Sequence, residues 1–297
     1  MNPSTSSRSH RFGLVGAFVT GREVVTFFVL TLALSWAVWL PGALGIVEFG
    51  SFTLAVIVIG GFGPLVAAAL VTWLVGDSLR SWVGQLLRWR VHYGWYLAAF
   101  TIPIVMFAAT FIVYSALGNP VEQAEVIQQI PVYLLPLIFV LNMVFVFLLG
   151  GGQEELGWRG FALPRLLNRL NAVTASVVIG AVWALWHFPL FLMDGSSQFD
   201  QPFVPYAIGL LALSIVFTWL YRGTGRSVFL AMILHASYNS ATVLIPFQPV
   251  QTGNISWFLA AVIWALALGL VVVYGRDLRS GETIDRETGE DGPPPAA

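Results

Sequence analysis

The sequence of 297 residues contains no cysteine, no lysine and few charges, since only 10% of its residues are charged. Without cysteine the chain can form no disulfide, no thiolate nucleophile and no cysteine-ligated metal site. A soluble domain carries about 25% charged residues, whereas 57% of this chain is hydrophobic. The formal net charge of -1 provides no basic surface for a nucleic-acid partner. The composition therefore indicates a protein whose principal partner is the lipid bilayer.

Eight apolar segments are long enough, or nearly so, to cross a bilayer as helices. They cover residues 24–44, 52–76, 94–117, 132–150, 172–192, 204–221, 227–246 and 255–275. We therefore expect an all-α integral membrane protein, with one bundle of about eight transmembrane helices over residues 24–275. Residues 1–23 are expected to form a cytoplasmic N-terminal segment without a cleavable signal. Residues 276–297 are expected to form a polar, disordered cytoplasmic tail.

The arginines predict how the bundle is oriented. All 14 basic residues are arginines, and with the N-terminus in the cytoplasm the eight spans place every one of them on the cytoplasmic side. The outer loops then carry acidic residues, namely Glu48, Glu122, Glu125, Asp194 and Asp200. This distribution follows the positive-inside rule. It predicts a multi-pass plasma-membrane protein with both termini in the cytoplasm.

The segment between the second and third spans has the pattern of a short amphipathic helix. Its apolar residues recur at helical spacing, as Leu79, Trp82, Val83, Leu86 and Leu87. Arg80 and Arg88 lie off that stripe. We expect a helix in the headgroup layer, and a solvated linker helix is the alternative.

A pair of glutamates, Glu154 and Glu155, follows the uncharged apolar stretch of residues 133–149. Neighbouring side chains on a helix diverge by about 100°, so the two carboxylates point to different faces. Glu155 and Arg159 are four residues apart and can pair along the helix. Glu154 is then expected to have no partner and to face a cavity, where a poorly solvated carboxylate can act as a general base. The alternative is that both glutamates decorate the cytoplasmic end of the span.

Two histidines, His187 and His235, are the only other ionisable groups within the later apolar segments. Such groups are costly at membrane depth and often mark function. Trp183 precedes His187 by four residues and can shield its imidazole from water. His235 and Asn239 share a helix face and can donate hydrogen bonds toward one point, as an oxyanion site requires. The alternatives are a histidine bonded to a backbone carbonyl and simple interhelical hydrogen bonding.

These residues resemble the motifs of the CAAX-protease and bacteriocin-processing family (CPBP or Abi) of intramembrane endopeptidases. Residues 154–161 are similar to its first motif, EExxxR. His187 matches the histidine of the second motif, FxxxH, and His235 and Asn239 match the third, HxxxN. The resemblance covers roughly residues 130–245, which would form the protease core. The second motif departs from the family, because its aromatic residue is Trp183 instead of phenylalanine.

The resemblance implies an endopeptidase of eight helices with its site near the cytoplasmic face. Glu154 and His187 would activate water, and His235 and Asn239 would form the oxyanion site. The second glutamate and the arginine of the first motif would hold the architecture together. Family members include proteases of prenylated proteins and proteins of bacteriocin maturation or immunity. The brevity of this chain favours a membrane-associated peptide over a prenylated protein as substrate.

Glu154, His187 and His235 also have the ligand types of a zinc site with an open position for water. The HExxH motif of soluble zinc proteases is absent. A metal-independent site is favoured, because Asn239 beside His235 suits an oxyanion donor. A zinc site would require an acceptor for the second nitrogen of each imidazole, and no carboxylate lies near either histidine in the sequence.

Two other classes of protein can carry such residues. A proton-coupled transporter also places glutamate and histidine within the membrane, but the sequence shows no repeat symmetry typical of carriers. A non-catalytic immunity or scaffold protein could keep the fold alone. Substitution Glu154→Gln separates the three classes, because it abolishes cleavage in a protease, transport in a carrier and nothing in a scaffold.

Overall fold

The computed structural model describes residues 16, 18–123, 130–199, 201–245, 247–250 and 252–279. Its α-helices are α2 (Glu23–Ala43), α3 (Thr53–Gly61), α4 (Gly63–Leu74), α5 (Leu79–Val83), α6 (Tyr93–Ala116), α8 (Leu135–Leu148), α9 (Glu155–Gly157), α10 (Leu163–Leu166), α11 (Ala172–His187), α12 (Phe203–Gly223), α13 (Val228–Ser240) and α14 (Thr252–Tyr274). Two short strands, β1 (Val121–Gln123) and β2 (Phe247–Pro249), pair antiparallel. Most of the N-terminal segment and the tail from residue 280, expected to be disordered, lie outside the described residues.

The predicted all-α membrane architecture is confirmed. Seven helical segments of the described chain are long and apolar enough to cross a membrane. The eighth expected span is present as the shorter apolar segment Val228–Leu244, which consists of α13 and a final 3₁₀ turn. The second span is interrupted at Phe62, where α3 ends and α4 begins. The chain is therefore a multi-pass membrane protein.

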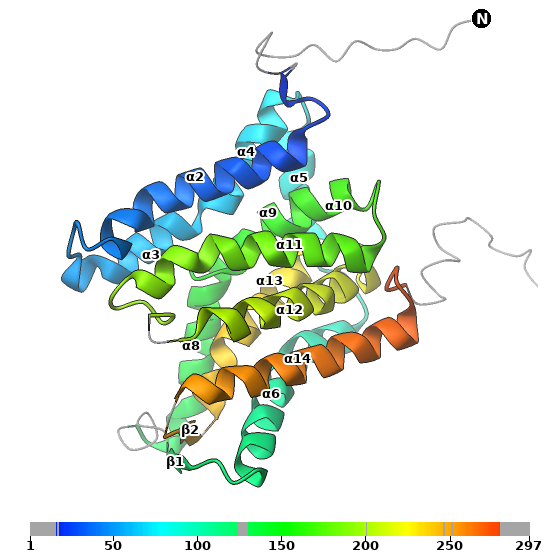
Figure 1. The fold of residues 1–297 in the computed structure, drawn as a ribbon. Helices are drawn as coiled ribbons and strands as arrows, with labels where there is room; N and C mark the ends of the chain where they lie inside the picture. Colours follow the sequence, from blue (N-terminus) through cyan, green and yellow to red (C-terminus); the bar gives the residue numbers. More distant parts are fainter. Residues whose placement is uncertain are drawn as a thin grey trace, which may run out of the picture.

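Four long helices, α2, α11, α12 and α14, lie side by side in that order (Figure 1). Helix α13 packs against α8 and α6, and so lies inside the bundle. Small residues allow close approach between membrane helices. At the α11–α12 contact, a Cβ atom added to Gly180 would lie 2.9 Å from the carbonyl oxygen of Leu210. This tight contact fixes the position of α11, which carries one of the histidines.

The loops that carry arginines meet at one end of the bundle. Arg88 Nη1 donates to the carbonyl oxygen of Gly225 at 3.3 Å, which joins the loop before α6 to the loop before α13. Arg165 Nη2 donates to Asp77 Oδ2 at 2.9 Å, which joins α10 to the end of α4. These two hydrogen bonds hold arginine-bearing segments together at one end of the bundle, where the sequence predicts that the arginines gather.

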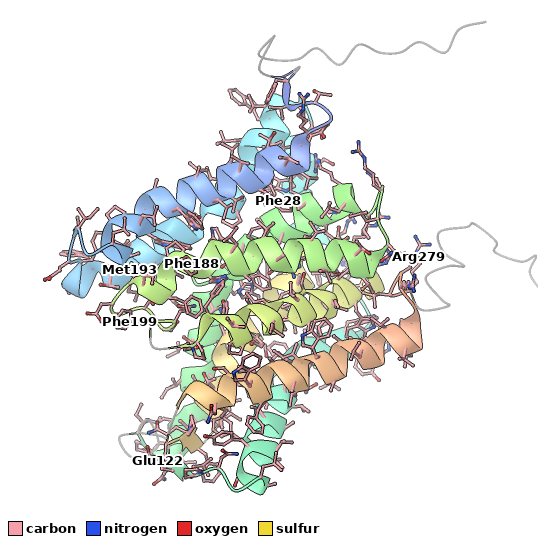
Figure 2. All side chains as sticks on the ribbon, in the orientation of Figure 1. Phe28, Glu122, Phe188, Met193, Phe199 and Arg279 are labelled. Carbon is pink, nitrogen blue, oxygen red and sulfur yellow. The ribbon has the colours of Figure 1, made fainter. Side chains whose placement is uncertain are left out.

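The acidic loops lie at the other end. Glu122 on β1 stands opposite Gln248 on β2, and Gln248 Nε2 donates to Glu122 Oε1 at 3.0 Å. Figure 2 shows Glu122 and Met193 at the end of the molecule opposite Arg279. The two ends of the bundle thus differ in charge, because one carries arginines and the other carries acidic residues.

The amphipathic segment forms the short helix α5 followed by a 3₁₀ turn, Gly84–Leu87, but its stripe is divided between two directions. Trp82 points into the bundle and donates its indole N–H to the carbonyl oxygen of Leu156 at 3.1 Å. Gln85 Nε2 donates to the carbonyl oxygen of Gly160 at 3.0 Å. The exposed apolar members of the stripe are Leu79, Val83 and Leu87. The segment therefore also supports the backbone that carries the glutamate pair.

Candidate active site

The glutamate pair lies on an irregular stretch of backbone between α8 and α10. Helix α8 ends at three consecutive glycines, Gly150–Gly152, and a 3₁₀ turn leads into α9. Residues Trp158–Ala162 then form a π-helical turn. Short π-helical turns within α-helices are frequent at functional sites. The sequence predicts an ordinary helix here, and the change of helix type is a feature that the motif spacing does not report.

Glu154 is buried, with 5% of its surface exposed, and its carboxylate is held by two tryptophans. Its Oε2 atom accepts a hydrogen bond from Trp158 Nε1 at 3.1 Å and another from Trp183 Nε1 at 2.9 Å. The expectation that Glu154 has no partner is therefore wrong, because two indole N–H groups donate to its carboxylate. Within the described chain no donor contacts its second oxygen, Oε1.

Glu155 forms the centre of a buried chain of charged groups. Arg159 Nη1 lies 3.0 Å from Glu155 Oε2, so the predicted pair exists. Glu155 Oε1 also accepts a hydrogen bond from His235 Nδ1 at 2.8 Å, a contact that the sequence did not indicate. Arg159 is fully buried, and its guanidinium carbon lies over the rings of Trp183 and Phe217, 4.8 and 4.3 Å from their centroids. Arg159 is therefore buried inside the bundle.

His187 makes the backbone contact that was considered as an alternative to function. Its Nδ1 atom lies 2.8 Å from the carbonyl oxygen of Trp183. A carbonyl oxygen can only accept, so Nδ1 carries a proton and the neutral imidazole presents an unprotonated Nε2. Aromatic rings of Trp186 and Tyr206 lie edge-on to the imidazole. The contact thus orients His187 and leaves its second nitrogen available.

Trp183 lies between the separate parts of the site. Its ring centroid is 6.1 Å from that of His187 and 5.4 Å from that of His235, and its N–H group reaches Glu154. No hydrogen bond among the described residues joins Glu154 directly to either histidine. The three expected groups are therefore brought around one indole, without a direct hydrogen bond between Glu154 and either histidine.

Asn239 and His235 both face the glycine turn. Asn239 Nδ2 donates to the carbonyl oxygen of Gly150 at 3.2 Å. A Cβ atom added to Gly151 would lie 2.4 Å from His235 Nε2 and 3.1 Å from Asn239 Nδ2. The two side chains converge on one place, as the sequence predicts, and the backbone of Gly150 and Gly151 lies there.

Gln153 fixes the shape of this glycine turn, and sequence reasoning did not single it out. Its Oε1 atom accepts from the backbone N–H of Gly151 at 3.0 Å, and its Nε2 atom donates to the carbonyl oxygen of Leu149 at 3.1 Å. Gly151 itself has φ of +136°, a conformation that favours glycine. The run of three glycines was the signal in the sequence that could have located the turn.

The candidate zinc ligands do not form a metal site in this arrangement. Over the described part of the chain, no group of three His, Asp or Glu side chains is placed to hold one ion. Glu154, His187 and His235 therefore do not fit a preformed zinc centre. Each imidazole does have an acceptor on Nδ1, supplied by Glu155 for His235 and by a backbone carbonyl for His187.

The site lies deep in the bundle. Asn171 caps α11 at its arginine-bearing end, and Trp183 follows twelve residues later, a rise of about 18 Å. Ser227 caps α13 at the same end, and His235 follows eight residues later, a rise of about 12 Å. The hydrocarbon core of a bilayer is about 30 Å thick. Trp183 and His235 therefore lie about one to two thirds of that thickness from the arginine-bearing ends of their helices.

This fold and site define a class: a multi-pass helical membrane protein with carboxylate, imidazole and amide groups gathered inside the bundle. Residues 136–241 match the sequence model of the family described as type II CAAX prenyl endopeptidase Rce1-like. These residues include all four candidate catalytic side chains. Over residues 136–241 the chain is therefore similar to this CAAX protease family.

Two known proteins are also similar to the chain. A protein named CAAX prenyl protease 2 from Methanococcus maripaludis is 33% identical over 131 residues, which are 41% of this chain and 48% of the relative. Lysostaphin resistance protein A from Staphylococcus haemolyticus is 21% identical over 268 residues, which are 87% of this chain and 66% of the relative. The chain thus spans about half to two thirds of the length of these relatives.

Proposed function

We propose that the chain is an intramembrane endopeptidase that hydrolyses a peptide bond of a membrane-associated protein or peptide. One observation carries the proposal: the buried carboxylate of Glu154 is fixed on one oxygen, while two oriented imidazoles surround the same tryptophan. A fixed, poorly solvated carboxylate beside a histidine suits general-base activation of water. The family and the relative named CAAX prenyl protease 2 support the same reaction class.

In the proposed reaction, Glu154 takes a proton from water while the water oxygen bonds to the scissile carbonyl carbon. The unprotonated Nε2 of His187 accepts a hydrogen bond from the second O–H of this water and orients it, while that hydrogen stays on the oxygen. The tetrahedral intermediate then collapses, the carbon–nitrogen bond breaks, and the departing amine receives the proton from Glu154. Glu154 is thereby returned to its starting state, and no co-reactant besides water is needed.

The oxyanion of the intermediate is the proposed ligand of Asn239 and His235. Asn239 donates from its amide, one N–H of which is held by Gly150 in the free protein. His235 donates to Glu155 through Nδ1, so its Nε2 can donate to an oxyanion when the ring is an imidazolium. Glu155 balances that charge, and Arg159 balances Glu155. The supporting residues thus act on the oxyanion site.

The substrate is proposed to be a membrane-associated peptide that reaches this depth from the cytoplasmic side. A membrane segment can enter a bundle laterally or from its polar end, and a prenyl anchor is one way to keep a peptide at the surface. A panel of membrane-anchored peptides, each with and without a farnesylated CAAX end, covers both substrate types.

The test is cleavage of this panel by the purified full-length chain in liposomes. We expect Glu154→Gln and His235→Ala to lower the rate by about 10²- to 10⁴-fold, the range for loss of a general base or an oxyanion donor. Glu48→Gln and His92→Ala are matched controls, because both residues are exposed and lie outside the site. Each protein is assayed with and without a chelator, which decides whether a bound metal is needed.

Three results would contradict the proposal. Cleavage that survives in Glu154→Gln would show that the carboxylate of Glu154 is not the general base. A wild-type protein that cleaves no peptide but moves protons across the liposome membrane, with transport lost in Glu154→Gln, would indicate the carrier instead. If neither cleavage nor transport is measured and Glu154→Gln changes nothing, the scaffold interpretation is favoured.

A further inference from the structure

The second motif of this chain contains tryptophan where the family has phenylalanine. The extra N–H group of this tryptophan, Trp183, donates a hydrogen bond to Glu154. We propose that Trp183, together with Trp158, is a positioning residue that fixes the carboxylate of Glu154 so that Oε1 is the oxygen that meets the water. This inference rests on the proposed function and adds to it a reason for the tryptophan. Phenylalanine at residue 183 could contribute the ring but not the hydrogen bond.

The geometry places both donors on one oxygen. Trp183 Nε1 and Trp158 Nε1 lie 2.9 and 3.1 Å from the same atom, Glu154 Oε2. The two indoles come from different elements, α11 and the π-helical turn, so together they hold the carboxylate from two directions. Hydrogen bonds to a charged acceptor are stronger than those between neutral groups. The carboxylate can therefore turn only by losing both of them.

The indoles themselves are held firmly. Trp158 is fully buried, and its ring packs edge-on against Phe27 and Trp186. Trp183 is 2% exposed, stands edge-on to Phe217 and lies beneath the Arg159 guanidinium. A donor that is itself immobile sets the direction of the group that it binds. The position of Oε1 is thus determined by packing outside the reacting groups.

A spectroscopic measurement tests the contact without any substrate. The carboxyl stretching band of Glu154 is identified by infrared difference between the wild type and Glu154→Gln, in liposomes. We expect Trp183→Phe to shift this band, and the same substitution in the Glu154→Gln background to leave that spectral region unchanged. Trp158→Phe provides a second, independent loss of a donor. An unshifted band in both single variants would overturn the proposal that the two tryptophans fix the carboxylate of Glu154.

A kinetic measurement tests the consequence for the reaction. The peptide of the panel that the wild type cleaves fastest is used with Trp183→Phe, Trp158→Phe and the double variant. We expect kcat to fall by about 10-fold or more in each single variant, and KM to stay within about twofold. Because phenylalanine keeps an aromatic ring at each position, a loss confined to kcat separates positioning from packing.

Trp264→Phe is the matched control. Trp264 is a half-buried residue of α14, and its indole N–H donates to the carbonyl oxygen of Ile208 at 3.0 Å and not to Glu154. We expect this variant to keep both the band position and kcat. A band shift without any change in kcat would overturn the positioning role. A wild type that cleaves nothing would instead contradict the proposed function. The infrared comparison would still show whether the two tryptophans fix the carboxylate of Glu154.

Discussion

At the scale of single residues, Gly151 shows how closely the chain's own backbone approaches the candidate oxyanion site. A Cβ atom there would lie 2.4 Å from His235 Nε2, a distance that real Cβ contacts do not reach. We therefore expect Gly151→Ala to lower cleavage by about 10²-fold or more, because His235 and the turn must separate. The measurement is the rate of peptide cleavage beside the melting temperature of the same protein.

Gly118→Ala separates this steric effect from backbone strain. Gly118 also has a positive φ, of +82°, but no atom lies within 4 Å of its Cβ position. Both substitutions place an alanine at positive φ, which costs of the order of 1 kcal/mol near the left-handed helical region of Gly118 and more at the φ of +136° of Gly151. Equal activity in the two variants would show that the approach to His235 is unimportant.

Residue by residue, the four candidate catalytic side chains could be selected from sequence because ionisable and amide groups are rare in this chain. Their partners could not. The hydrogen bond from His235 to Glu155 joins residues 80 positions apart, and that from Trp183 to Glu154 joins residues 29 apart. Tryptophan in an apolar segment is read as a packing residue, so its role as a donor emerges only when two elements are placed together.

At the scale of secondary structure, the segment from α9 to α10 depends on an element far away in the sequence. The carbonyl oxygens of Leu156 and Gly160 accept from Trp82 and Gln85, on α5 and the 3₁₀ turn that follows it. A π-helical turn disturbs the regular hydrogen-bond ladder of the backbone, and side-chain donors can satisfy the carbonyl groups at such a site. The motif sequence alone predicts a regular helix, because the stabilising donors lie outside it.

This dependence predicts a local loss of order when the donors are removed. We expect Trp82→Phe and Gln85→Ala each to raise deuterium uptake over residues 155–162, as followed by mass spectrometry of the protein in detergent. The expected cost is about 1 kcal/mol of stability for each hydrogen bond. Trp89→Phe is the control, because Trp89 is 49% exposed. Uptake that rises equally in the control would remove the supporting role of α5.

At the scale of the whole molecule, the hydrophobic segments predicted the helices well because bilayer thickness sets their length. The expected spans and the observed helices agree in number, once the short segment Val228–Leu244 is included. That short segment is sheltered by α6 and α8. Packing between helices of similar composition could not be predicted, because lipid-facing and helix-facing residues are equally apolar here.

The distribution of charge along the molecule predicts its orientation, and the absence of cysteine makes the orientation simple to measure. Any single cysteine introduced into the chain is its only thiol. Ser81 is exposed beside the arginine-bearing loops, and Ser197 is exposed at the other end, between Asp194 and Phe199. The positive-inside rule places the arginines in the cytoplasm. A membrane-impermeant maleimide should therefore label Ser197→Cys in intact cells, and Ser81→Cys only after the membrane is opened. Labelling of Ser81→Cys alone in intact cells would show that the bundle has the opposite orientation. A substrate from the cytoplasm would then meet the acidic end of the molecule first.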